Sequence, residues 1–188
     1  MAVKTRQANT HALYFVTFTC VKWLNLFSAT DIYDSIYKWF NYMITRGVYV
    51  TGFVIMPNHL HLLLYLSPES PELMKMIGNG KRFLAYEIVK RLEASGKSQL
   101  LDFMQREVKA SDRKNKKRHE VFQPSYDAKE CFSLDFIKQK LQYMHKNPVS
   151  KKWSLADSYL DYPHSSARFY SLGEENSWFE LKDVRDFL

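Results

Sequence analysis

Two histidines separated by a single leucine are the residues of this sequence whose types and spacing are best suited to chemistry. Alternate residues of a β-strand project from the same face, so His59 and His61 can both point at one metal ion while Leu60 enters the opposite, apolar layer. The same pattern also occurs where two polar residues end a strand. The pair therefore suggests a metal site and does not establish one.

Three polar residues near the end of the chain, Gln139, Tyr143 and Asn147, are spaced four apart and share one face of a predicted helix. The phenol of Tyr143 could act as a nucleophile. Each residue also has an ordinary interpretation, because amphipathic tyrosines often lie at the edge of a core, and Asn147 can simply end the helix before Pro148.

The elements that would position these residues follow from hydrophobic periodicity, since alternation predicts strands and three- or four-residue spacing predicts helices. The expected order begins with a strand over Ala12–Val21, a helix over Asp31–Arg46, and strands over Val48–Met56 and Leu60–Leu66. A bent or two-part helix over Glu72–Leu92 with breaks at Gly78 and Gly80, a long exposed loop over Ser95–Glu120 and a strand within Val121–Cys131 follow. The last helix is capped by Ser133 or Asp135 and runs to about Asn147.

This order of elements predicts an α+β fold of the ferredoxin-like, split βαβ type. We expect an antiparallel sheet of four to five strands with helices on one face, plus a C-terminal extension. Residues 1–150 would form the main domain, and residues 151–188 would form a tail that packs on it. The chain is 46% hydrophobic, which is enough for one sizeable core.

The charge balance favours a polyanionic partner, with nucleic acid as the first expectation, because 27 Lys and Arg exceed 20 Asp and Glu. The candidate phosphate contacts are Lys81, Arg82, Lys90 and Arg91 on the long helix, and Arg113, Lys114, Lys116, Lys117 and Arg118 in the basic run. That run is equally typical of a solvated loop. Tyr126, Trp153 and Phe169 are candidates for stacking on unpaired bases, although most aromatic residues in such a chain belong to the core.

Cysteine usage and hydropathy exclude other classes. Cys20 and Cys131 are far apart with no CxxC pair, which argues against a disulfide scaffold and fits a reducing, cytoplasmic location. No apolar run approaches the roughly 18 residues that a membrane span needs, so we expect no membrane partner.

Five segments match sequence motifs of a known family, and they occur in the same order as in that family over most of the chain. They are Val54–Leu63 (VIMPNHLHLL) and Tyr143–Val149 (YMHKNPV), supported by Tyr14–Thr19, Lys81–Phe83 and Tyr162–Ala167. The sequence resembles the HUH single-tyrosine (Y1) transposases of the insertion-sequence 200 type. Within that family it is most similar to the transposases associated with repetitive extragenic palindromes (REP) of bacteria.

The resemblance implies that residues 1–150 form an HUH catalytic domain in which His59, His61 and Asn147 hold a divalent metal, Mg²⁺ or Mn²⁺. Tyr143 would attack a phosphorus atom of single-stranded or hairpin DNA, giving a 5′-phosphotyrosine and a free 3′-hydroxyl that can be rejoined without ATP. Because imidazole ligands ordinarily suit Zn, Mn or Ni better than Mg, we expect adventitious Zn or Ni in a purified sample.

The sequence leaves several alternatives open. An ordinary phenol is protonated at neutral pH, and metal, Lys146, His145 or solvent could assist Tyr143. The chain could act as a monomer or as a homodimer that exchanges tyrosine helices. Besides a metal-dependent DNA transposase or nickase, it could be a catalytically silent hairpin-DNA-binding protein derived from a mobile element. An RNA-binding ferredoxin-like module ranks lowest, because Val48–Met56 lacks the RNP1 motif.

Overall fold

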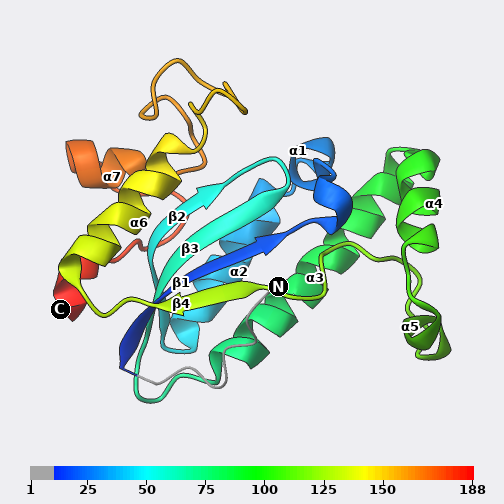
Figure 1. The fold of residues 1–188 in the computed structure, drawn as a ribbon, viewed down its shortest axis with the longest axis horizontal. Coiled ribbons are helices and arrows are strands. Elements are labelled where there is room, and N and C mark those ends of the chain that lie inside the picture. The colour runs from blue at the N-terminus through cyan, green and yellow to red at the C-terminus, as the bar shows by residue number, and fades with distance from the viewer. Residues whose placement is uncertain (1–10) are drawn as a thin grey trace.

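A four-stranded antiparallel sheet lies at the centre of the computed structural model, which describes residues 11–188 (Figure 1). The first ten residues of the predicted 1–150 domain lie outside this range. The strands are β1 (Ala12–Thr19), β2 (Val48–Ile55), β3 (His59–Leu66) and β4 (Asp127–Glu130), in the spatial order β2-β3-β1-β4. This is the strand order of the split βαβ arrangement, so the predicted α+β, ferredoxin-like fold class is confirmed, with four strands.

Seven α-helices are described between and after the strands. They are α1 (Leu26–Thr30), α2 (Tyr33–Thr45), α3 (Leu73–Ala94), α4 (Ser98–Arg106), α5 (Ala110–Lys114), α6 (Leu134–Lys146) and α7 (Ala167–Leu172), with short 3₁₀ turns at Val21–Trp23 and Val184–Phe187. Two expectations were wrong in detail. The 95–120 stretch contains α4 and α5 instead of only a loop, and α3 is one continuous helix and not a two-part helix.

Helices α2 and α3 cover one face of the sheet and enclose the larger core. Leu60, Leu62 and Leu64 of β3 are fully buried in it. Gly80 has a packing role in α3, because a Cβ atom at this position would lie 2.2 Å from Cε2 of Trp39 on α2. The glycine that resembles a helix break in the sequence thus allows two helices to approach closely.

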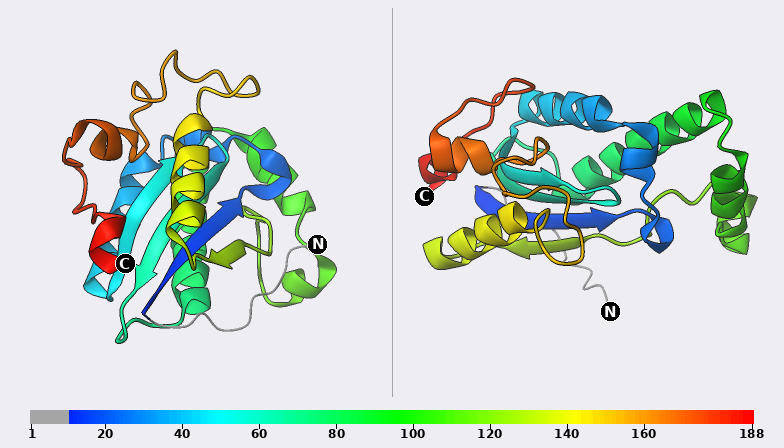
Figure 2. Two further views of the ribbon diagram at one scale, coloured as in Figure 1. Left: turned by 60° about the vertical axis from the view of Figure 1, so that its left-hand side comes forward. Right: turned by 90° about the horizontal axis from the view of Figure 1, so that it is seen from above.

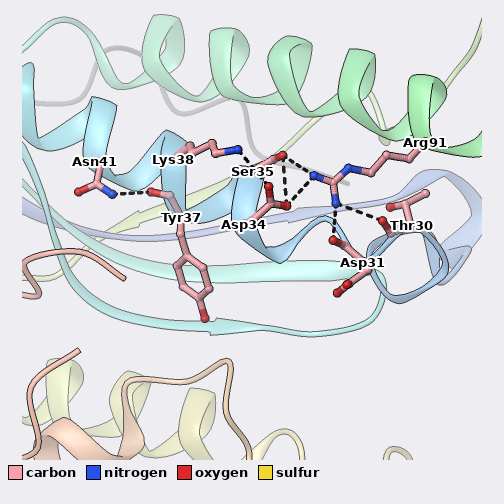
Figure 3. A network of polar contacts seen from close by, with 8 residues as sticks. All are labelled: Thr30, Asp31, Asp34, Ser35, Tyr37, Lys38, Asn41 and Arg91. Atoms are coloured by element: carbon pink, nitrogen blue, oxygen red, sulfur yellow. Dashed lines mark hydrogen bonds and ion pairs between the residues drawn. The ribbon is translucent and has the colours of Figure 1, made fainter. Parts of the chain in front are cut away.

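Arg91 of α3 ties this helix to the start of α2 (Figure 3). Its guanidinium donates to the carbonyl oxygens of Thr30 and Asp31, and it also pairs with Asp34 at 2.6 Å and donates to Ser35 at 3.0 Å. A residue that the sequence groups with the phosphate contacts is therefore already engaged within the domain.

Helix α6 covers the other face of the sheet, as the right-hand view of Figure 2 shows. The prediction of helices on one face holds for α2 and α3 and is wrong for α6. The physical reason is visible in β3, where all eight residues are buried, including Leu63 and Tyr65 between the leucines of the first core. A strand that is apolar on both faces requires cover on both faces.

The chain after α6 packs against α6 and runs along the free edge of β2. Ile55 donates its backbone N–H to His164 O at 2.9 Å, and Ser166 donates to Phe53 O at 2.9 Å, so residues 164–166 extend the ladder. Lys182 donates to Val50 O further along the same strand. The edge of β2 is therefore covered. Within residues 11–188, no helix is both long and apolar enough to cross a membrane.

Candidate active site

The two histidines lie side by side at the start of β3, on the face that α6 covers. Their ring centroids are 4.8 Å apart, and each side chain is only about 4% exposed. Leu60 between them is fully buried in the opposite core. The strand spacing thus places both imidazoles on one face, as the sequence predicts.

Each imidazole is oriented through its Nδ1 atom. Thr17 Oγ1 of β1 lies 2.7 Å from His61 Nδ1, and Asn58 Oδ1 lies 2.7 Å from His59 Nδ1. Since the amide nitrogen of Asn58 donates elsewhere, to Trp23 O and Asn25 Oδ1, its oxygen faces His59 and accepts from Nδ1–H. That tautomer leaves a lone pair on His59 Nε2, which is the form that binds metals.

Both imidazoles are held neutral. Burial, assisted by the charge of Lys152, lowers the pKa of His59 to about 4. Burial also lowers the pKa of His61 to about 3, with further contributions from His59 and from the charge of Lys140. At neutral pH the pair therefore offers unprotonated nitrogens.

Helix α6 brings Tyr143 and Asn147 to the same place. The Tyr143 ring centroid is 5.2 Å from that of His61, and the Tyr143 side chain is 53% exposed. Asn147 ends the helix with its Nδ2 atom 3.4 Å from His59 Nε2. The four residues that sequence reasoning selected from two distant segments are neighbours in the fold.

The local sequence explains how α6 lies so close to the sheet. Ser133, one of the two caps that the sequence offers, caps the helix by accepting from Phe136 N at 3.3 Å. Gly52 of β2 leaves room for the helix, because a Cβ atom there would lie 2.8 Å from Leu141 Cδ2. Met144 is fully buried on the inner side of the helix. Tyr143, its neighbour in sequence, is left at the open side.

The donor atoms fit a divalent cation. His61 Nε2 is buried and makes no hydrogen bond with any residue of the described part of the chain, an arrangement that costs free energy unless another group binds there. His59 Nε2 faces the amide of Asn147, whose oxygen is one rotation of the amide away. Within residues 11–188, no cluster of three or more histidine, cysteine or acidic side chains is placed to hold a metal ion. The fit therefore rests on two imidazoles and one amide.

Two lysines that sequence reasoning missed lie beside these residues. Lys140, one turn before Tyr143 on α6, has its ammonium 5.9 Å from the Tyr143 ring centroid and 4.9 Å from that of Phe15. Lys152 lies over the rings of Trp23 and Trp153. The three-residue interval to Tyr143 is helical spacing and could have indicated Lys140. Nothing in the sequence placed Lys152 near His59.

The candidate groups for activating Tyr143 differ in position. His145 is buried on the other side of α6, where its Nε2 lies 2.8 Å from Ser166 Oγ and burial lowers its pKa to about 4. Lys146 is exposed at the end of the helix. His145 therefore belongs to the contact between α6 and the tail.

The basic residues predicted on α3 lie on the side of the sheet away from Tyr143. Lys81 is half-buried, and its ammonium donates to the carbonyl oxygens of Gln123 at 2.7 Å, Pro124 and Ser125. Arg82 donates to Asn79, and Lys90 is exposed. The structure does not bring these three side chains to the histidines.

The basic run forms a separate surface around α4 and α5 (Figure 1). Arg113 donates to the carbonyl oxygens of Val108, Gln105 and Arg106, and Lys117 pairs with Glu120 at 2.7 Å. Lys114 is exposed on α5. An open hollow is lined by Gln105, Arg106, Arg113, Lys116, Lys117 and Arg118. This surface is also distant from α6 in both views of Figure 2.

Comparison with solved structures identifies a shared fold. A structure described as the REP-associated tyrosine transposase bound to a REP hairpin matches with a TM-score of 0.58 and 16% sequence identity, over 97% of this chain and 93% of that chain. A structure described as a putative transposase from Deinococcus radiodurans R1 matches with a TM-score of 0.38 and 15% identity, over 78% of this chain and 97% of that chain. No protein-family model and no curated protein matches the sequence. The first similarity shows that the chain has the fold that the motifs led us to expect.

Proposed function

We propose that this chain, which has the fold of a REP-associated tyrosine transposase, is itself a metal-dependent DNA transposase or nickase that cleaves and rejoins single-stranded DNA near hairpins. The observation that supports the proposal is the convergence of His59, His61 and Asn147 beside the exposed hydroxyl-bearing ring of Tyr143. A nucleophile, two metal-binding imidazoles and an amide meet at one open position on the sheet.

His59, His61 and Asn147 would hold Mg²⁺ or Mn²⁺. The bound ion would supply positive charge that binds a phosphate oxygen and stabilises the charge that develops during transfer. Because His59, His61 and Asn147 would all be neutral ligands, they would leave the positive charge of a bound ion available to the phosphate. Lys140 and Lys152 add two ammonium groups near the same position.

Tyr143 would carry out the covalent step. Its Oη atom attacks the phosphorus and loses its proton to solvent or a nearby base. The bond from phosphorus to the 3′ oxygen breaks, and that oxygen takes up a proton and leaves as a 3′-hydroxyl. The 5′ side of the DNA stays on the enzyme as a phosphotyrosine ester. One phosphodiester is exchanged for another, so no external energy is needed.

Rejoining would be the same reaction in reverse. A 3′-hydroxyl from the same or another strand attacks the phosphotyrosine, and the bond to Tyr143 Oη breaks as the phenol regains a proton.

Phe15 helps to fix the geometry, since it stacks on His61 with a centroid separation of 5.4 Å and meets Tyr143 edge-on at 6.3 Å. Tyr143 is therefore positioned against the Phe15 ring, which itself packs on His61, one of the proposed metal ligands.

The test is formation of a covalent adduct. Purified protein is incubated with single-stranded oligonucleotides that contain imperfect palindromes, with Mn²⁺ or Mg²⁺ or with chelator, and products are separated on a denaturing gel. We expect a metal-dependent protein–DNA adduct that is absent in Tyr143→Phe. Tyr86→Phe is the matched control, because Tyr86 is also an exposed helical tyrosine, 72% exposed on α3.

Two results would contradict the proposal. An adduct that persists in Tyr143→Phe would remove the nucleophile assignment. Tight hairpin binding without any adduct across a broad palindrome pool would instead indicate the silent hairpin-binding protein.

A further inference from the structure

Two indole side chains flank His59, and no part of the proposed chemistry uses them. Trp23, in the 3₁₀ turn after β1, and Trp153, in the segment after α6, each have a ring centroid 5.7 Å from that of His59. We propose that Trp23 and Trp153 form a binding site for an unpaired nucleobase next to the reacting phosphate. This inference rests on the proposed function and adds to it a contact that distinguishes unpaired from paired DNA.

The position of Trp23 carries a backbone cost. Lys22 and Trp23 both have positive φ values, 49° and 59°, a region that bulky residues rarely adopt. The result is an indole that is 52% exposed in spite of its large apolar surface. Folding alone gives no reason to strain the chain in order to expose a tryptophan. Such strain is concentrated at binding and catalytic sites.

One side chain links this indole to the metal-ligand candidates. Asn58 Nδ2 donates to Trp23 O at 2.8 Å, and Asn58 Oδ1 accepts from His59 Nδ1 at 2.7 Å. The amide therefore fixes the turn that presents Trp23 and the imidazole that faces the phosphate position. A base that stacks on Trp23 would be held in register with a phosphate beside His59.

Lys152 marks the space between the indoles as accessible to a ligand. Its ammonium lies 5.0 Å from the Trp23 ring centroid and 5.4 Å from the Trp153 ring centroid. The lysine is exposed and lies against both rings, of which Trp23 is 52% exposed and Trp153 is partly buried against the core on the α6 side of the sheet. A planar base can take the same place by stacking, and the released ammonium can pair with a backbone phosphate.

The chemistry favours a nucleobase of single-stranded DNA as the occupant. Indole faces bind bases by stacking without strong sequence preference, and a base within a duplex is stacked on its neighbours and unavailable. The phosphate attached to that nucleotide would lie beside the histidines, where two lysines add positive charge. The site would thus select the single-stranded flank of a hairpin.

The experiment measures DNA binding in a Tyr143→Phe background, so that no cleavage occurs. Two hairpins with a single-stranded flank are compared, one intact and one with abasic sites throughout the flank. Trp23→Leu removes the aromatic face and keeps much of the apolar surface, and Trp23→Phe restores an aromatic face. Trp178→Leu is the matched control, because Trp178 is 55% exposed and contacts Tyr37 of α2, on the side of the sheet away from His59 and His61.

We expect Trp23→Leu to weaken binding of the intact flank by roughly 5- to 150-fold, the usual range for one stacked base, and to leave abasic binding unchanged. Intact DNA should quench tryptophan fluorescence in the parent and in Trp178→Leu, and less in Trp23→Leu. Trp23→Phe should recover most of the affinity. These results together would support the site.

Other outcomes overturn the inference in distinguishable ways. Unchanged affinity in Trp23→Leu, with adduct formation intact when Tyr143 is restored, overturns the stacking site and leaves the proposed function standing. Equal loss on intact and abasic DNA shows that Trp23 only supports the fold of the turn. If the parent binds neither hairpin and the wild-type protein forms no adduct, the proposed function fails, and the inference fails with it.

Discussion

The two faces of strand β3 differ in what they leave unsatisfied. Toward α2 and α3, Leu60, Leu62 and Leu64 are fully buried among apolar side chains. Toward α6, His59 and His61 are also buried, but His61 Nε2 has no hydrogen-bond partner among the described residues, 11–188. Both sets alternate along the same eight-residue strand.

This contrast shows how the chain separates stability from chemistry. A closed apolar face contributes to folding, whereas a buried ring nitrogen without a partner costs about 1–3 kcal/mol, and in His61 that nitrogen carries a lone pair that a metal ion could use. Substitutions on the two faces should therefore change different properties. The predictions below test that separation.

The largest expected effects come from two separate substitutions in β3, at neighbouring residues that lie on opposite faces of the sheet. His61→Leu should reduce adduct formation at least about 100-fold, because a metal ligand is lost, and should leave stability unchanged or slightly higher. Leu62→Ala should cost about 2–5 kcal/mol of unfolding free energy through a cavity in the larger core. Urea unfolding and the adduct assay measure the two effects separately. If His61→Leu is as destabilising as Leu62→Ala, the two faces are not divided in this way.

Metal addition offers a further readout of the same pair. A divalent ion that binds only the folded state should raise the Tm of the wild-type protein and not that of His61→Leu. Equal shifts in both proteins would show that the ion binds elsewhere.

The next effect concerns the closed face alone. Gly80→Ala would put a Cβ atom 2.2 Å from Trp39 Cε2, so we expect a loss of about 1–3 kcal/mol from forced repacking. Gly78 is the matched control on the same helix, because a Cβ atom there has open space around it. Gly78→Ala should stabilise by about 0.5–1 kcal/mol through helix propensity. Unfolding curves of both variants decide, and a stabilising Gly80→Ala would contradict the close approach of α3 to α2.

A smaller effect, on the rate of adduct formation, is expected from Lys140 on the α6 side of the sheet. Lys140→Gln should slow adduct formation about fivefold, equivalent to about 1 kcal/mol, because one ammonium near Tyr143 is removed. Lys138→Gln on the same helix removes the same charge from an exposed position on another side and should have little effect. Single-turnover rates at saturating DNA separate this role from binding. Equal slowing in both variants would indicate a general charge effect.

These comparisons also show which features were accessible from the sequence. The neighbouring strands β2 and β3, the shared face of His59 and His61, and the capped helix that carries Tyr143 depend on local periodicity and capping. The position of α6 on the second face was missed, although the continuous apolar character of β3 signals cover on both sides.

The roles of the basic residues were not accessible in the same way. Lys81 and Arg91 carry the charge expected of phosphate contacts, yet their partners are carbonyl and carboxylate groups more than forty residues away in sequence. Likewise, Lys152 approaches His59 only because the segment after α6 folds back over the sheet. Charge can be read from a sequence, but the partner of a charge depends on the tertiary fold.

The last expected effect is absent at neutral pH and appears only on acidification, at His164, where the tail meets α2. His164 Nδ1 is 3.1 Å from Tyr37 Oη, and its ring stacks on Tyr33 at 3.6 Å. Tyr162 and Asp31 also face it. Burial lowers the pKa of His164 to about 4, although the charge of Asp31 acts in the opposite direction.

The sign of the pH dependence follows from the two states. An unfolded histidine has a pKa of about 6.5, so between pH 6.5 and 4 the unfolded chain binds a proton that folded His164 does not. This histidine therefore lowers stability progressively as pH falls through that window and adds nothing above it. His164→Gln keeps a polar partner for Tyr37 and cannot titrate. Its stability relative to wild type should rise steadily from pH 6.5 to 4 in urea unfolding series, whereas parallel curves would mean that the tail is not held by a neutral imidazole.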